Sequence, residues 1–190
     1  MRWYKRGFPV LGNLLTVVLF CIFNMGLTLF FKNIEFPRAF SSLSAVLCGT
    51  LLGPVPGIIA GLIINTFGIL LFGYSVLTWA DFLISCSLGL VCGLFLNRKS
   101  YISIFSFFCI LFVFTILPTL IVAVSCFGHS HVSLSRQMGY MVVNFQLLGF
   151  SEYSSILFSC FIFNLIEKSF SLMLAFFLYA AVKRTQKSNY

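Results

Sequence analysis

The amino-acid sequence predicts an all-α integral membrane protein, a six-helix transmembrane bundle. Sixty per cent of its 190 residues are hydrophobic and 8 % are charged, whereas a soluble domain typically has about 25 % charged residues. The mean hydropathy is +1.06. Six apolar runs approach the length needed to cross about 30 Å of hydrocarbon. Because no long polar stretch separates these runs, we expect a single transmembrane domain over residues 1–190.

The six predicted spans lie at about residues 8–31, 39–52, 56–73, 76–96, 101–126 and 154–182. The second is short for a perpendicular crossing, and we count it because the third follows so closely that the two read as a hairpin. Proline is tolerated in the first turn of a helix but not in its middle, so Pro54 and Pro56 end one helix and open the next. Four glycines recur here at every fourth position, a spacing that lets helix backbones approach closely in lipid: Gly49, Gly53, Gly57 and Gly61.

The positive charges predict how the bundle is oriented. With six spans, one side holds both termini and the residues Arg2, Lys5, Arg6, Arg98, Lys99, Lys183, Arg184 and Lys187. The opposite loops hold only Lys32, Arg38 and Arg136. Cytoplasmic loops carry the excess of Lys and Arg, so both termini are expected to be cytoplasmic. No small-residue cleavage motif follows the first run, which is therefore expected to stay as an anchor.

The last apolar run contains an adjacent acid and base, Glu167 and Lys168, in a chain with only four acidic residues. An ionisable side chain at bilayer depth costs roughly 2.5–3.5 kcal/mol on insertion scales. Asn164, Glu167, Lys168 and Ser171 follow the i, i+3, i+4, i+7 spacing of one helix face. We therefore predict that Lys168 faces the protein interior with Asn164. Because adjacent helical residues do not face each other, we expect Glu167 and Lys168 each to find a partner on another helix or a ligand atom.

A second polar stripe lies on the predicted fourth span, at Thr78, Asp81, Ser85 and Gly89. Trp79 beside it fits an interfacial aromatic residue. Asp81 is a candidate ligand contact, and a cap or salt bridge at the interface explains it equally well.

The predicted external segment 127–153 contains apolar residues at helical spacing: Met138, Met141, Val142, Phe145 and Leu148. This pattern predicts a short amphipathic helix. A lid over a cavity and a helix on the membrane surface both fit it.

No catalytic constellation is apparent in the sequence. It has no Gly-x-Ser-x-Gly elbow, no His-Glu-x-x-His helix and no phosphate-binding glycine loop. His129 and His131 share one external loop without an acidic or thiolate third ligand. The seven cysteines are odd in number and never spaced as Cys-x-x-Cys, so they read as small apolar fillers. We expect no enzymatic activity, no metal site and no cofactor.

Two segments together resemble one family. Residues 52–61, LGPVPGIIAG, are similar to the Gly-Pro-x-x-Gly-x-x-x-Gly hairpin of the substrate-binding S components of energy-coupling factor (ECF) vitamin transporters. Residues 164–175, NLIEKSFSLMLA, followed by Lys183 and Arg184, resemble the last span of many such proteins. An acidic-Lys pair and a small-residue face commonly precede a basic cytoplasmic end there; the acid is commonly Asp, and this chain has Glu.

The resemblance implies a six-helix subunit of the bacterial cytoplasmic membrane that binds a vitamin or similar micronutrient from outside. Asn164, Glu167, Lys168, Asp81 and Trp79 would then contact the ligand. The partners implied are a T-component membrane scaffold and a pair of cytoplasmic ATPases. Metal-ion members of the family carry a histidine near the first residue, whereas this chain begins Met-Arg-Trp, which favours an organic ligand.

Two other functions fit the span pattern. A multi-span sensor or regulatory module would act through a separate partner kinase, because the chain ends eight residues after Val182. A self-sufficient small transporter would be expected to show an inverted repeat, and none is evident.

Overall fold

The computed structural model describes residues 10–33, 42–72, 78–95, 104–128 and 136–188, and within these ranges the chain forms seven α-helices and no strand. The helices are α1 (Val10–Asn33), α2 (Leu43–Leu52), α3 (Pro54–Phe72), α4 (Thr78–Phe95), α5 (Ile104–Gly128), α6 (Arg136–Leu147) and α7 (Glu152–Ser188). The predicted all-α class is confirmed. Each predicted span overlaps one helix, and α6 is the extra helix predicted between the fifth and sixth spans.

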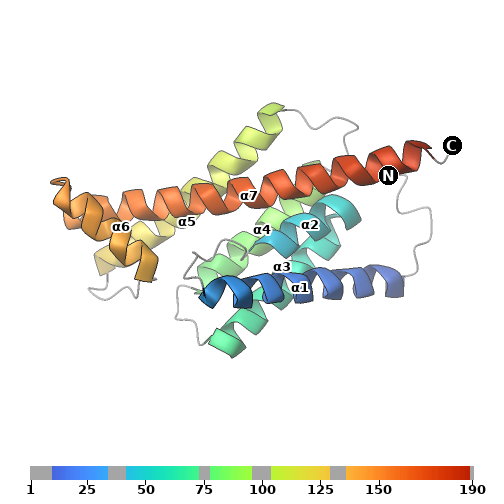
Figure 1. Cartoon of the computed structure of the whole chain (residues 1–190), viewed down its shortest axis with the longest axis horizontal. Coiled ribbons are helices and arrows are strands. Elements are labelled where there is room, and N and C mark those ends of the chain that lie inside the picture. The colour runs from blue at the N-terminus through green and yellow to red at the C-terminus, as the bar shows by residue number, and fades with distance from the viewer. Residues whose placement is uncertain (1–9, 34–41, 73–77, 96–103, 129–135, 189–190) are drawn as a thin grey trace.

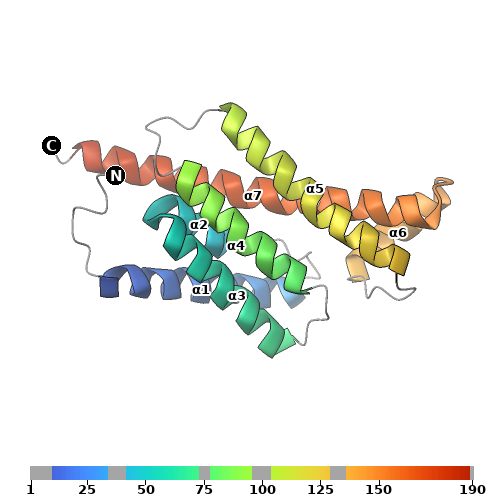
Figure 2. The ribbon, with the colours of Figure 1, turned by 180° about the vertical axis from the view of Figure 1, so that it is seen from behind.

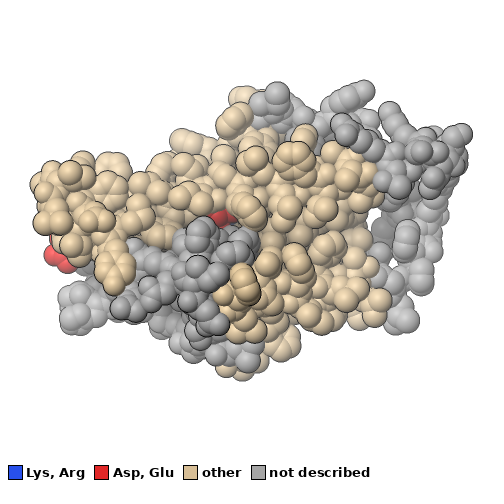
Figure 3. Space-filling view, in the orientation of Figure 1, with Lys and Arg blue, Asp and Glu red and all other residues tan. Residues whose placement is uncertain are grey.

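Two of the described helices are long and apolar enough to cross a membrane, α5 over Phe105–Val122 and α7 over Glu152–Val182. Only 28 % and 22 % of these stretches are buried, whereas the core helix of a soluble protein would be mostly buried. The face in Figure 3 has almost no charge among its described atoms. These features indicate a membrane protein. The apolar parts of α1 to α4 are shorter, at 10–17 residues, so six full crossings do not follow from helix length.

α1 and α7 lie along the long axis of the molecule, and α3, α4 and α5 run obliquely to it (Figures 1 and 2). α3 packs against α4, and α5 packs along α7. α2 contacts α1, α3, α4 and α7, so it occupies the centre of the bundle. The start of α1 and the end of α7 lie toward the same end of the molecule (Figure 1).

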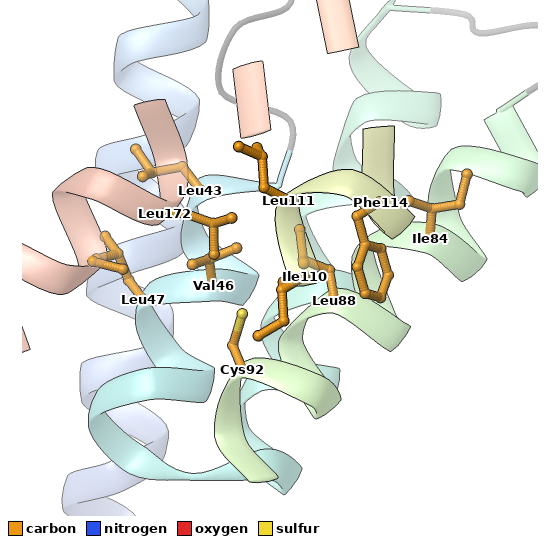
Figure 4. Packing of buried hydrophobic residues seen from close by; sticks show 11 residues of the cluster. Leu43, Val46, Leu47, Ile84, Leu88, Cys92, Ile110, Leu111, Phe114 and Leu172 are labelled. Carbon is orange, nitrogen blue, oxygen red and sulfur yellow. The ribbon is translucent and has the colours of Figure 1, made fainter. Parts of the chain in front are cut away.

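The central helix α2 is short and enclosed. Its ten residues measure about 15 Å, half the thickness of a bilayer core, and every residue from Ser42 to Thr50 is buried. Its apolar side chains join those of α4, α5 and α7 in one core (Figure 4). The labelled members are Leu43, Val46, Leu47, Ile84, Leu88, Cys92, Ile110, Leu111, Phe114 and Leu172.

Glycines bring the backbones of α2, α3 and α4 into direct contact. A Cβ atom added to Gly57 of α3 would lie 2.6 Å from the carbonyl oxygen of Gly89 and 2.8 Å from Cα of Gly49. A Cβ on Gly61 would lie 3.0 Å from the backbone nitrogen of Cys86. No side chain fits at Gly57, so the predicted role of the repeated glycines in close packing is confirmed.

The junction between α2 and α3 depends on Gly53. Its φ of 115° and ψ of 179° are open almost only to glycine. Its N–H donates to the carbonyls of Cys48 and Gly49, and the Gly49 carbonyl is one of the four at the end of α2 that have no partner within the helix. α3 begins at Pro54 rather than at the predicted residue 56, because first-turn N–H groups have no partner within the helix and both prolines fit there.

The predicted amphipathic helix is present as α6, and it packs against α7. Val142 is buried, and Met138, Met141 and Phe145 are partly buried. Leu148 does not belong to this face. It follows the helix and is 73 % exposed, because Gly149, at a φ of 89°, already turns the chain toward α7.

Candidate functional site

Three polar side chains meet inside the bundle, two from the middle of α7 and one from the start of α2. Nζ of Lys168 lies 3.1 Å from Oε1 of Glu167 and donates to Oγ of Ser42 at 3.2 Å. Ser42 in turn donates its hydroxyl to Oε1 of Glu167 at 3.2 Å. Lys168 is 3 % exposed and Glu167 is 9 % exposed. We call these three residues the Ser42 cluster.

The predicted inward orientation of Lys168 is confirmed, and so is the expectation that Glu167 and Lys168 each find a partner outside their own helix. The two side chains pair with each other and share one partner, Ser42. Adjacent side chains leave a helix in different directions, yet both of these are long enough to bend toward the same hydroxyl. That hydroxyl, 125 residues away from Glu167 in the chain, was not singled out by the sequence.

Ser42 occupies the N-cap position of α2, and its side chain makes no cap hydrogen bond with that helix. The hydroxyl serves the ion pair instead. The cluster therefore lies where the partial positive charge of the α2 dipole favours a carboxylate such as that of Glu167. A charged pair in an apolar interior is stable only when each charge is compensated. The hydroxyl and the helix end both contribute to this compensation.

The cluster retains unused hydrogen-bonding groups. A lysine ammonium has three N–H donors, and the described residues supply Lys168 with two acceptors, Glu167 and Ser42. One turn further along α7, the hydroxyl of Ser171 is fully buried and has no hydrogen-bond partner. The i, i+3 spacing puts Ser171 on the same helix face as Lys168. These two groups could bind an oxygen atom of a small molecule or a water.

Asn164, predicted to share the site, faces α5 instead of the cluster. Its amide donates to the carbonyl of Cys160 at 2.9 Å and approaches Oγ1 of Thr119 at 3.4 Å. Thr119 lies directly after Pro118, where the missing proline N–H leaves one backbone carbonyl of α5 without its usual helical donor. The structure thus brings together Glu167 and Lys168 and places Asn164 at a separate helix contact.

The opposite side of α2 is tied to α1 by a second polar contact. Nδ2 of Asn24, which is fully buried, donates to Oγ of Ser44 at 3.2 Å. Oδ1 of Asn24 has no hydrogen-bond partner. Sequence inspection did not single out either residue, although an asparagine in an apolar run that is buried in lipid or protein always needs partners. Polar contacts therefore hold the first turn of α2 from both sides.

The second predicted stripe, on α4, is only partly described. Trp79 and Asp81 lie in the first turn of α4, and their side chains fall outside the described residues. Ser85 is buried. Gly89 is used for packing, because a Cβ there would lie 2.6 Å from the carbonyl oxygen of Gly57.

The two helices that carry the polar stripes are separated by α2. In the described residues, α4 and α7 do not pack against each other, and α2 contacts both. α6 contacts α7 alone among the described helices, so it does not cover a space between α4 and α7. The helix between α4 and α7 is therefore α2.

The chemistry open to the Ser42 cluster is recognition of a polar group. Among the described side chains, no three His, Cys, Asp or Glu residues are grouped so that they could hold a metal ion. Lys168 and Ser42 offer N–H and O–H donors, and Glu167 offers acceptors. Comparison of the chain with protein-family models, with curated proteins and with solved structures gave no match.

Proposed function

We propose that this protein is a membrane-embedded substrate-capture subunit of an importer, of the type that the S components of ECF transporters represent. It binds a vitamin or similar small organic micronutrient from outside the bacterial cytoplasmic membrane. A T-component scaffold and two cytoplasmic ATPases then drive uptake. Both termini are cytoplasmic in this proposal, which accords with α1 beginning and α7 ending toward the same end of the molecule (Figure 1).

The observation that carries the proposal is the ion pair of Glu167 and Lys168 at the start of a half-length buried helix. Stability alone does not favour such a pair, because apolar side chains of similar volume are usually as stabilising or better. Ionisable residues at membrane depth commonly mark substrate or ion pathways. Broken helices whose ends point into a bundle are also a recurrent way to build substrate sites in transporters.

Ligand recognition would use the groups that the cluster leaves unused. An acceptor oxygen of the ligand would take the third N–H of Lys168, and the buried hydroxyl of Ser171 would add a second bond. Glu167 and Ser42 would hold the lysine in place. Apolar walls with a few fixed polar groups are typical of small-molecule sites.

The test is purification in a mild detergent followed by mass spectrometry of retained small molecules and of co-purifying proteins. The wild type should retain one organic micronutrient and bring with it a membrane scaffold and two ATPases. The matched variant combines Glu167→Gln with Lys168→Met. Both charges are removed together, so no buried charge is left without its partner. This variant should remain folded and lose the retained molecule.

Lys187→Met serves as the control, since Lys187 lies beyond the apolar part of α7 and should not affect retention. Two results would count against the proposal. One is a wild-type protein that retains no small molecule and co-purifies with no ATPase. The other is a neutral double variant that retains the same molecule as the wild type, which would leave the ion pair a structural role only.

A further inference from the structure

The helix α6 has two apolar faces, and the described part of the chain packs against only one of them. The inner face packs on the first turns of α7, where Sγ of Cys160 lies 3.6 Å from Sδ of Met138. The ring of Phe145 lies 5.9 Å from that of Phe158 and 5.8 Å from that of Phe150. α6 is thereby fixed to one end of α7 (Figures 1 and 2).

The outer face of α6 is also largely apolar. Tyr140, Val143 and Leu147 follow the i, i+3, i+7 spacing of one helix face, and they are 56 %, 52 % and 80 % exposed. Among the described side chains of α6, Asn144 and Gln146 are the exposed polar ones. Arg136, the first residue of the helix and its one charged residue, precedes Tyr140 by four positions. The sequence from residue 138 to residue 151 contains no charged residue. A helix whose outer face met only water would be expected to carry charges there.

The depth of α6 follows from its contacts with α7. Phe158 and Cys160 lie 25 and 23 residues before Lys183, the first cation after the apolar stretch. A helix needs about 20 residues to cross about 30 Å of hydrocarbon. If Lys183 marks one boundary of the membrane, α6 lies at the other boundary. At twelve residues, or about 18 Å, α6 is too short to cross by itself.

We propose that α6 is an interfacial helix whose outer face, Tyr140, Val143 and Leu147, contacts lipid at the boundary between headgroups and acyl chains. Apolar side chains are also exposed near the end of α5, which packs along α7: Leu120 is 55 % exposed and Val124 is 71 % exposed. Tyrosine is enriched at this depth because its ring is apolar and its hydroxyl is polar. The proposal does not depend on the function assigned to the Ser42 cluster.

The test is tryptophan quenching in lipid nanodiscs. Trp3 and Trp79, the two native tryptophans, are first replaced by Phe. Leu147→Trp then places one reporter on the outer face, and Val143→Trp gives a second in case the first variant does not fold. Phosphatidylcholine with brominated acyl chains should quench either reporter by about half, as expected for an apolar face buried about 5–10 Å into the interface. Aqueous iodide should quench them weakly.

Gln146→Trp is the matched control on the same helix, because its exposed position lies to one side of the outer face. It should be quenched less by the brominated lipid and more by iodide. If iodide quenches residues 143 and 147 strongly and the lipid does not, α6 faces water and the proposal is wrong. If neither quencher reaches them, a protein surface covers α6, and the proposal is equally wrong.

Discussion

At the scale of single residues, the sequence predicted the charged half of the Ser42 cluster and missed the half that compensates it. Glu167 and Lys168 were conspicuous because ionisable residues are rare in an apolar run. Ser42 and Asn24 gave no comparable signal, since small polar residues occur throughout such runs. Their importance depends on contacts between residues far apart in the chain, which periodicity does not report. The position of Ser42 directly before a short apolar helix was the one available hint.

Ser42→Ala should destabilise the protein by about 1–3 kcal/mol, because two buried charged groups each lose a hydrogen-bond partner. Thermal or denaturant unfolding in detergent measures the loss. Ser87→Ala is the control, since the Ser87 hydroxyl bonds only the carbonyls of its own helix, at Leu83 and Ile84. Equal stability of the two variants would show that Ser42 does not support the ion pair.

Lys168→Met alone should cost about 3–5 kcal/mol, since it leaves the Glu167 carboxylate buried without its cation. Adding Glu167→Gln to Lys168→Met should recover most of that loss. The four proteins of this double-mutant cycle are compared by their unfolding midpoints. A double variant that is no more stable than Lys168→Met would contradict a coupling between the two charges.

At the scale of secondary structure, apolar runs located the helices, because a backbone in an apolar environment must satisfy its hydrogen bonds internally. Helix ends were less predictable. α7 continues six residues beyond the predicted end at residue 182, since hydropathy reports the lipid boundary and Lys or Arg residues support a helix well. The glycine repeat of α2 and α3 correctly predicted close helix packing. Gly89, the α4 residue that this repeat contacts, was predicted only as part of a polar stripe.

Gly57→Leu should prevent normal assembly of α2, α3 and α4, because even a Cβ at this position would lie 2.6 Å from a backbone oxygen of α4. We expect a low yield of folded protein and early elution as aggregate in size-exclusion chromatography. Gly26→Leu on α1 is the control, since a Cβ at Gly26 meets no atom within 4 Å. A Gly57→Leu protein that purifies and melts like Gly26→Leu would contradict the packing of these three helices.

At the scale of the whole molecule, composition predicted the class of the protein, and the arrangement of helices around α2 needed the structure. A half-length helix that starts inside a bundle and a short span that crosses a membrane can both be ten apolar residues long. Hydropathy therefore does not distinguish them. The polar contacts of Ser42 and Ser44 distinguish them here, because they fix the start of α2 between α1 and α7. The 31-residue apolar stretch of α7 measures about 46 Å, so in a membrane with about 30 Å of hydrocarbon this candidate span would tilt or project beyond it.

The orientation is testable with reporter fusions. The predicted orientation has six crossings, with the basic residues on the cytoplasmic side. The C-terminus and residues 97–100 are then cytoplasmic, and residues 127–153 are external. Alkaline phosphatase, which is active only when exported, should be active when fused after Ser130 and inactive after Asn97 or Tyr190. Green fluorescent protein should give the reverse pattern, which controls for expression of each fusion. Active phosphatase at Tyr190 would mean either an odd number of crossings or an inverted bundle, and either result would contradict the predicted orientation.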